Sequence, residues 1–290
     1  MSTNDRLEPL NALIHVYSRN QTMPNATLDF QSFSITPIHA YSDNYIWCIH
    51  TEEKAWVVDP GDHKVVEAFL TEHKLDLDGI IITHHHWDHI TGISKLTSNR
   101  QIPVYGPSHP KIPEVTEVVN EGDQLNIFGL QLTVLFVPGH TLEHIAYFGI
   151  TAAGQPLLFC GDTLFCAGCG RLFEGTPAQM NHSLQRLTTL NDETLVFCTH
   201  EYTESNLKFA LEVEPDNTDI EAELSIVQAL DTSKQPSLPT SIAKEKRINP
   251  FLRASLPQIR QKLTEQFGVS ADTFSEDECF AAVRRWKDNF

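Results

Sequence analysis

The sequence has 290 residues, of which 41% are hydrophobic and 20% charged, and its formal net charge is −17. This balance is ordinary for a globular protein, and no run reaches the roughly 20 apolar residues of a membrane helix. The negative charge disfavours nucleic acid and anionic lipid as partners. The N-terminus lacks the basic start and apolar run of a secretory signal, so we expect a cytoplasmic protein, with a monomer as the default state.

The first half of the chain predicts mainly strands. Residues 1–33 are polar and weakly periodic, and we expect an N-terminal extension without regular structure there. Short runs of β-branched and aromatic residues between polar turns then predict three strands, over Ser34–Ala40, Tyr45–Thr51 and Ala55–Asp59. Apolar residues at helical spacing predict a helix over Asp62–Lys74. The continuous apolar run Gly79–Thr83 predicts a strand buried on both faces.

Strands and helices separate further along the chain. Four more strands are predicted at Leu130–Val137, Ile145–Ile150, Leu157–Cys160 and Leu195–Cys198, with a helix over Pro177–Leu190. Beyond residue 200 only helical patterns occur, over Glu204–Glu214, Asp219–Leu230, Leu256–Phe267 and Glu276–Lys287. We therefore predict an α/β domain over residues 34–200, followed by a small helical domain over residues 201–290.

The strongest functional signal is the run THHHWDH, which starts where the strand Gly79–Thr83 ends. In extended chain, residues i and i+2 point the same way, so His84 and His86 can face one point in space. A tight turn would bring Asp88 and His89 to a second point nearby. Imidazole and carboxylate together suit a divalent cation such as zinc or iron.

Three further residues of ligand type follow predicted strand ends. His140 lies in VPGHT, Asp162 in CGDT and His200 in CTHE, each just after an apolar strand. Each alone would also suit a surface turn or a helix cap. Together with the histidine run, they would deliver ligands to one edge of a sheet, where open α/β folds place their sites.

The six cysteines predict no disulfide framework. Their spacing is irregular, and most lie in or beside apolar runs, which is typical of free buried thiols. Cys166 and Cys169 form a C-x-x-C pair within a glycine-rich turn, a weak signal for metal or redox chemistry.

The order H-x-H-x-D-H, a lone histidine, G-D and a late histidine resembles the metallo-β-lactamase superfamily. The motifs THHHWDH, GDTLFCAGCGR, HEYT, INPFLR and AVRRWKD resemble glyoxalase II, the hydroxyacylglutathione hydrolases, over about residues 34–290. The resemblance implies the αββα sandwich of that superfamily, followed by a helical substrate-binding domain.

The resemblance also implies a metal-ligand set. His84, His86 and His140 would bind one ion, Asp88, His89 and His200 a second, and Asp162 would bridge the two. His85 and His144 match positions that are not ligands, and Asp59 would support the ligand shell. The ions would be zinc, with iron or manganese as alternatives that the same donors accept.

The implied reaction is hydrolysis of the thioester S-D-lactoylglutathione to glutathione and D-lactate, the second step of methylglyoxal detoxification. A hydroxide shared by the ions would be the nucleophile, with Asp88 and Asp162 as the carboxylates that hold it. Glutathione would be bound by Arg171, Phe173, Tyr202, Arg284 and Lys287. Many family members have lysine at position 171 and tyrosine at position 173.

Two observations bear on the substrate and on the alternatives. Residues 241–290 hold nine Lys/Arg against seven Asp/Glu, so the helical end could offset the acidic surface for an anionic substrate. The same residues would also suit a solvated helix end. The alternatives are another hydrolase of this fold, such as a lactonase, β-lactamase or nuclease, an iron-dependent glutathione persulfide dioxygenase, or a metal-binding module without catalysis.

Overall fold

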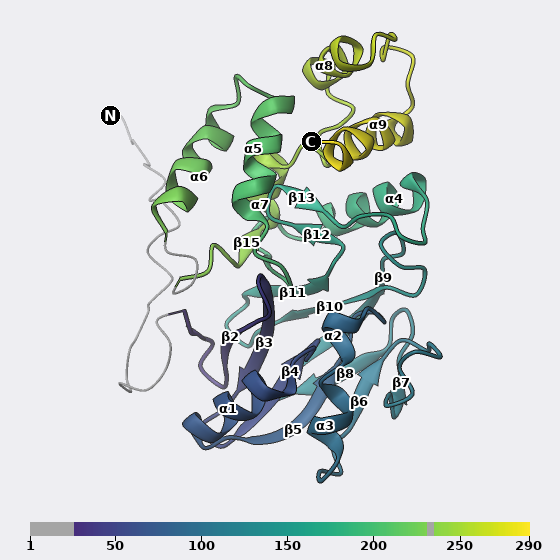
Figure 1. Ribbon diagram of the computed structural model, residues 1–290. Helices are drawn as coiled ribbons and strands as arrows, with labels where there is room; N and C mark the ends of the chain where they lie inside the picture. Colours follow the sequence, from purple (N-terminus) through teal and green to yellow (C-terminus); the bar gives the residue numbers. More distant parts are fainter. Residues whose placement is uncertain (1–25, 231–234) are drawn as a thin grey trace, which may run out of the picture.

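The structure is a computed structural model that describes residues 26–230 and 235–290 (Figure 1). Two sheets lie face to face in the middle of the molecule, and helices cover their outer faces. This is the predicted αββα sandwich, and the C-terminal helices follow it in the chain and pack at one end.

The first sheet has its strands in chain order from β1 to β7. Their bounds are Leu28–Asp29, Ser34–Ala40, Asn44–His50, Lys54–Val58, Asp76–Ile81, Val104–Gly106 and Glu117–Val118. Every residue of β3 is buried, because one face packs on the second sheet and the other on helices α1 (His63–His73) and α3 (Ile93–Thr97). Burial on both faces explains why its sequence, NYIWCIH, does not alternate between apolar and polar residues.

The second sheet has the order β15-β14-β11-β10-β9-β8. The bounds are Gln124–Ile127 for β8, Leu130–Phe136 for β9, Ile145–Ile150 for β10, Pro156–Gly161 for β11, Leu195–Cys198 for β14 and Thr240–Ser241 for β15. The two sheets meet through aromatic side chains: the Trp47 ring lies 5.0 Å from the Phe197 ring, and Trp47 Nε1 donates to the carbonyl of Cys198 at 3.0 Å. The indole is thus buried with its one polar atom paired.

Four of the remaining seven helices begin after a residue whose side chain accepts a backbone N–H of the first turn. Their bounds are Trp87–Ile90 for α2, Pro177–Thr188 for α4, Thr203–Val213 for α5, Thr218–Ala229 for α6, Ile242–Ile248 for α7, Pro257–Phe267 for α8 and Glu276–Asp288 for α9. Helices α4 and α9 both start with a capping box, Thr176 with Gln179 and Ser275 with Glu278. Because α9 buries Phe280 and Val283 against the main core, the C-terminal helix is held firmly to the sandwich.

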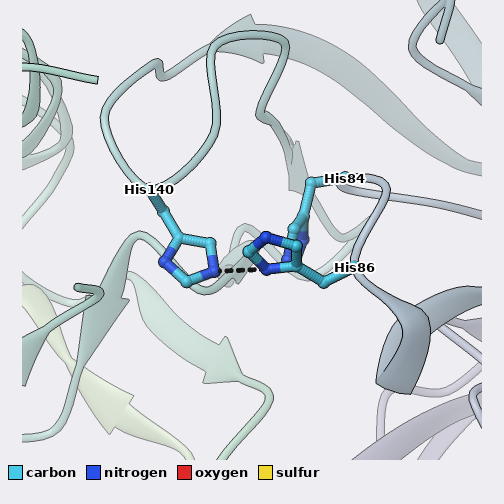
Figure 2. Close-up of side chains that lie close together, drawn as sticks. All are labelled: His84, His86 and His140. Carbon is cyan, nitrogen blue, oxygen red and sulfur yellow. Dashed lines mark hydrogen bonds between the residues drawn. The ribbon is translucent and has the colours of Figure 1, made fainter. Parts of the chain in front are cut away.

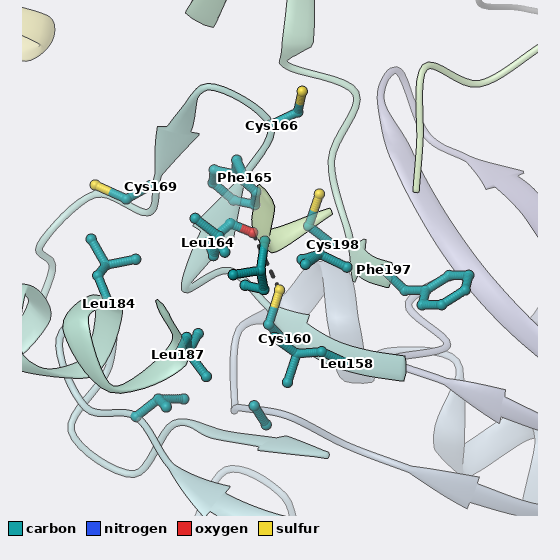
Figure 3. Packing of buried hydrophobic residues seen from close by; sticks show 14 of the residues in the cluster. Leu158, Cys160, Leu164, Phe165, Cys166, Cys169, Leu184, Leu187, Phe197 and Cys198 are labelled. Atoms are coloured by element: carbon teal, nitrogen blue, oxygen red, sulfur yellow. Dashed lines mark hydrogen bonds between the residues drawn. The ribbon is translucent and has the colours of Figure 1, made fainter. Parts of the chain in front are cut away.

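The cysteines belong to this core. All six are buried and unpaired, as predicted. Cys166 lies in the turn, and Cys169 at the far end, of the tight hairpin formed by β12 (Leu164–Phe165) and β13 (Gly168–Cys169). Figure 3 shows their sulfur atoms pointing apart. Burial raises the pKa of Cys169 to about 11, so this thiol stays protonated and is poorly suited to redox or metal chemistry.

The structure departs from the sequence predictions at two boundaries. Most of the predicted extension, residues 1–25, lies outside the described residues, but β1 pairs with β2 and Phe33 is buried, so the sheet begins before residue 34. The C-terminal part is not only helical, because β15 pairs with β14 at the edge of the second sheet. None of the described helices combines the length and apolar character needed to cross a membrane.

Candidate metal centre

The predicted ligands meet at one edge of the sandwich. The histidine run follows β5, His140 follows β9, Asp162 follows β11 and His200 follows β14. Strands β9, β11 and β14 point the same way, since β9 and β11 are both antiparallel to β10 and β14 is parallel to β11. Their carboxyl ends therefore share one edge, which the end of β5 faces from the first sheet.

One group of side chains is formed by His84, His86 and His140, whose imidazole rings converge in Figure 2. One ring nitrogen from each lies within 4.8 Å of the others. The closest pair is His140 Nε2 and His86 Nδ1, which are 2.9 Å apart. Three nitrogen donors at this spacing can reach a single cation.

A second group is formed by Asp88, His89 and His200, with ligand atoms again within 4.8 Å of one another. Asp88 Oδ2 lies 3.5 Å from His89 Nε2 and 3.4 Å from His200 Nε2. Burial lowers the pKa of His200, but Asp162 and Asp43 outweigh it and raise that pKa to about 9. The carboxylates around His200 therefore favour positive charge at this point, whether a proton on the ring or a metal cation.

Asp162 lies between the two groups. Its Oδ1 is 3.5 Å from His89 Nε2, and its Oδ2 is 3.3 Å from both His140 Nε2 and His200 Nε2. The carboxylate is 6% exposed. A carboxylate in this position can offer one oxygen to each of two neighbouring cations.

The hydrogen bonding at the centre tests whether these residues fit a metal. His84 Nε2, His89 Nε2 and Asp162 Oδ1 are buried atoms with no hydrogen-bond partner among the described residues. An unpaired buried polar group costs about 1–3 kcal/mol, and all three atoms point into the same small volume as the other ligands. Burial, followed by the neighbouring His140, lowers the pKa of His86 to about 4, which keeps the ring in its neutral, metal-binding form. The residues present therefore fit divalent cations.

Outer contacts hold the ligands in place. Asp59 Oδ2 lies 3.0 Å from His89 Nδ1, and the same carboxylate accepts the N–H and the hydroxyl of Thr83 at 2.8 and 2.7 Å. His140 Nδ1 donates to the carbonyl of Arg171 at 2.8 Å. Asp59 thus has the contacts expected of a supporting residue.

Two histidines beside the proposed ligands make other hydrogen bonds. His144 Nε2 accepts the N–H of Asp162 at 3.1 Å and its Nδ1 lies 3.3 Å from Thr163 Oγ1. His85 Nδ1 donates to Glu143 at 2.5 Å, and its Nε2 lies 3.1 Å from Lys111 Nζ. Ligand-type atoms of His85, His109 and Glu143 also lie within 4.8 Å of one another. The rings of His85 and His109 stack in parallel with centroids 4.0 Å apart, so their nitrogens lie in two separate planes.

A cavity of about 880 Å³ opens from the metal centre toward the C-terminal helices. The five residues predicted to bind substrate all line it: Arg171, Phe173, Tyr202, Arg284 and Lys287. Five of the predicted ligands line its floor: His86, Asp88, His140, Asp162 and His200. The cavity therefore connects a site that can hold cations to a wall that carries positive charge.

The cationic wall is built mainly on α9. Arg284 is 5% exposed and donates to the carbonyl of Cys169 at 3.1 Å and to Asp288 at 2.8 Å. Lys287 donates to the carbonyl of Ser205 at 3.0 Å. Arg171 is more exposed and lies 3.8 Å from Asp288. These contacts hold Arg284 and Lys287 in fixed positions at the cavity.

Aromatic rings line the cavity beside the ligands. Tyr202 stacks on His200 with centroids 4.7 Å apart, and Phe173 packs edge-on against His86 and His140 at 5.3 Å each. Trp87 is 62% exposed at the rim, a position that the sequence analysis did not single out.

Two further residues near the ligands were not predicted: Asp43, in the turn between β2 and β3, and Asn44, the first residue of β3. Asp43 Oδ1 lies 2.7 Å from His200 Nδ1, and Asn44 Nδ2 donates to Asp88 Oδ2 at 3.0 Å. Aspartate and asparagine are common in turns, so nothing local distinguishes these two from ordinary turn residues.

Comparisons with known proteins agree on one family. A model of the metallo-β-lactamase superfamily matches residues 42–200, and a model of the hydroxyacylglutathione hydrolase C-terminus matches residues 201–290. The hydroxyacylglutathione hydrolase of Cupriavidus taiwanensis is 48% identical over 265 residues, covering 88% of this chain and 98% of that protein. The enzyme of the same name from Aliivibrio salmonicida is 50% identical over 260 residues, covering 88% and 99%.

Solved structures share the fold. ETHE1 from Myxococcus xanthus is 27% identical with a TM-score of 0.58, covering 87% of this chain and 97% of that one. TTHA1623, solved in a di-iron-bound form, is 25% identical with a TM-score of 0.54, covering 75% and 100%.

Proposed function

This chain belongs to the hydroxyacylglutathione hydrolases of the metallo-β-lactamase superfamily, and on that premise we propose that it hydrolyses S-D-lactoylglutathione to glutathione and D-lactate. Thioester hydrolysis is the reaction of the family. The observation that carries the proposal for this substrate is the cavity that joins the ligand cluster to the cationic wall. A tripeptide thioester with two carboxylates matches that combination.

Seven side chains would hold two divalent cations, one for each group of ligands, with Asp162 shared between them. They are His84, His86, Asp88, His89, His140, Asp162 and His200. We propose zinc as the metal, with iron and manganese as alternatives that imidazole and carboxylate donors also accept. Two such cations would lower the pKa of a shared water toward neutrality and polarise the thioester carbonyl.

The chain itself would bind and orient the thioester. Arg284 and Lys287 would attract a glutathione carboxylate, and Arg171 would add positive charge nearer the ligands. Tyr202 would hold the peptide against the His200 side of the cavity, and Phe173 would exclude water on the His86 side. A thiol has a pKa of about 8.5, so the leaving thiolate needs little help from a general acid.

The test is a direct assay of the purified protein. We expect loss of the thioester of S-D-lactoylglutathione, with one thiol and one D-lactate released per molecule, and about two equivalents of metal by elemental analysis. A lactone and glutathione persulfide, the latter with oxygen uptake measured, serve as comparison substrates. Faster turnover of either comparison substrate would contradict the proposal, and so would metal retention without any hydrolysis.

A further inference from the structure

The two halves of the metal centre are supported differently, and the difference starts at the turn between β2 and β3. Asp43 Oδ1 lies 2.7 Å from His200 Nδ1, and an ionised carboxylate can only accept, so Nδ1 of His200 carries the proton. This contact leaves His200 Nε2 as the ring nitrogen that can bind a cation. That atom faces Asp88 and Asp162 at 3.4 and 3.3 Å.

The next residue, at the start of β3, holds a second ligand. Asn44 Nδ2 donates to Asp88 Oδ2 at 3.0 Å. Two adjacent residues therefore orient two members of the group Asp88, His89 and His200. Neither makes a hydrogen bond to the group His84, His86 and His140 within the described part of the chain.

Backbone contacts fix the turn against the segment that carries His200. The carbonyl of Asp43 accepts the N–H of Glu201 at 2.8 Å, and the N–H of Tyr45 donates to the carbonyl of Thr199 at 2.6 Å. Tyr45 also donates its hydroxyl to the Glu201 carboxylate at 2.7 Å. The turn is thus bonded on both sides of His200, which keeps the Asp43 carboxylate opposite the imidazole.

The imidazoles of the two groups differ in the partner of their outer nitrogen. Among the described residues, Nδ1 of His200 contacts the carboxylate of Asp43, and Nδ1 of His89 contacts the carboxylate of Asp59. In the other group, His140 donates to a backbone carbonyl, and His84 Nδ1 lies 3.0 Å from the hydroxyl of Thr83. A carboxylate partner makes an imidazole a stronger donor to metal than a neutral oxygen does.

Resting on the proposed metal centre, we infer that Asp43 is a positioning residue that makes the Asp88–His89–His200 half the tighter of the two metal sites. It acts through His200, by fixing the tautomer and orientation of the ring and by raising its basicity. Its neighbour Asn44 supports the same half through Asp88.

The experiment measures metal affinity without substrate. Metal-free protein is titrated with zinc in competition with a chromophoric chelator, in the wild type and in Asp43→Asn, which keeps the shape of the side chain but removes its charge. We expect one of the two zinc equivalents, the tighter, to weaken about 10- to 100-fold, and the other to keep its affinity. Ser42→Ala, which removes only a hydrogen bond to the other oxygen of Asp43, serves as the matched control and should bind both ions normally.

Combining Asp43→Asn with a second substitution shows which of the two metal sites loses zinc affinity. In His140→Ala, which disables the other half, Asp43→Asn should still weaken the remaining ion. In His200→Ala the effect of Asp43→Asn should vanish, because the group through which it acts is gone. Equal weakening of both ions in the single variant, or an undiminished effect in His200→Ala, would overturn the inference.

Thioester hydrolysis by the wild type is recorded alongside. A wild type that binds two unequal zinc ions but hydrolyses no thioester would overturn the proposed function and leave the role of Asp43 standing. Full hydrolysis by the wild type together with unchanged zinc affinities in Asp43→Asn would overturn the role of Asp43 and leave the proposed function standing.

Discussion

At the scale of single residues, Asp162 lies where the two groups of proposed ligands meet. Its two oxygens face members of both groups, and Oδ1 is buried with no hydrogen-bond partner among the described residues. Asp162→Ala should therefore lose metal and activity together. We expect kcat/KM to fall by more than about a thousandfold, since several kcal/mol of charge stabilisation disappear at about 1.4 kcal/mol per tenfold in rate.

Elemental analysis and the thioester assay on the same preparation check this prediction. Asp216→Ala removes an exposed carboxylate far along the chain and should change neither quantity. An Asp162→Ala protein with full metal content and full rate would show that the two groups do not share this ligand.

Lys287 should give substrate binding a pH dependence of its own. Burial, together with Arg284 and Arg171, lowers the pKa of Lys287 to about 8. The ammonium group is charged below this pKa and neutral above it, so its attraction for a carboxylate is present at pH 7 and is lost as the pH rises through about 8. Allowing for its partial exposure, we expect kcat/KM to fall roughly fivefold above that pH.

The pH profile of Lys287→Arg provides the check. A guanidinium stays protonated throughout this range, so the fall in kcat/KM near pH 8 should disappear. An identical fall in the variant would assign it to another group, such as one at the metal centre.

At the scale of elements, the sequence predicted best those strands whose apolar runs are bounded by turn residues on both sides. The predicted and observed bounds agree at Ser34–Ala40, Ile145–Ile150 and Leu195–Cys198. The short strands β6, β7, β12 and β13 were not predicted, because two or three residues carry no periodicity and pair only where the fold brings a neighbour alongside.

The site likewise contains residues that a local sequence pattern predicts and residues that only the folded chain brings together. The predicted ligands are rare residue types placed directly after strand ends, so their convergence could be expected from the chain order of strands. Asp43 could not be predicted, because its partner lies 157 positions away and the contact exists only once the two sheets have packed. Long-range contacts of common residues leave no local pattern.

The loop after β4 is coupled to α2 by close backbone packing. A Cβ atom on Gly61 would lie 1.8 Å from the carbonyl oxygen of Asp88, so any larger residue must displace the segment that carries this ligand. We expect Gly61→Ala to lose zinc from one of the two sites and to lower kcat/KM at least about tenfold.

Asp62→Ala is the matched control for Gly61→Ala. It removes the N-cap of α1, in the same loop, at a cost of about 1 kcal/mol in stability. That variant should unfold more easily but keep its zinc. A Gly61→Ala protein with normal zinc affinity would show that Asp88 tolerates displacement.

At the scale of the whole molecule, the sandwich and the C-terminal helices contribute different residues to one cavity. The sandwich carries the proposed metal ligands at the ends of strands from both sheets, and α9 carries Arg284 and Lys287. The net charge of −17 would repel an anionic thioester from most of the surface. The cationic wall therefore supplies positive charge at one place on an otherwise acidic protein. It lies beside the proposed ligands, where the thioester would enter.

Because the ligands come from loops of both sheets, bound metal should hold the sandwich closed. A ligand at a thousand times its Kd stabilises the native state by about 4 kcal/mol. Removing the metal with a chelator should therefore lower the melting temperature by roughly 10 °C, at about 2–4 °C per kcal/mol for a chain of this size. Calorimetry with and without added zinc measures the shift, and added zinc should restore the original melting temperature.

The same chelator should change the melting temperature of Asp162→Ala far less, because that variant has already lost the shared ligand. If the chelator left the wild-type melting temperature unchanged, the two sheets would be held by the apolar core alone, and the orphaned atoms His84 Nε2 and His89 Nε2 would need another explanation.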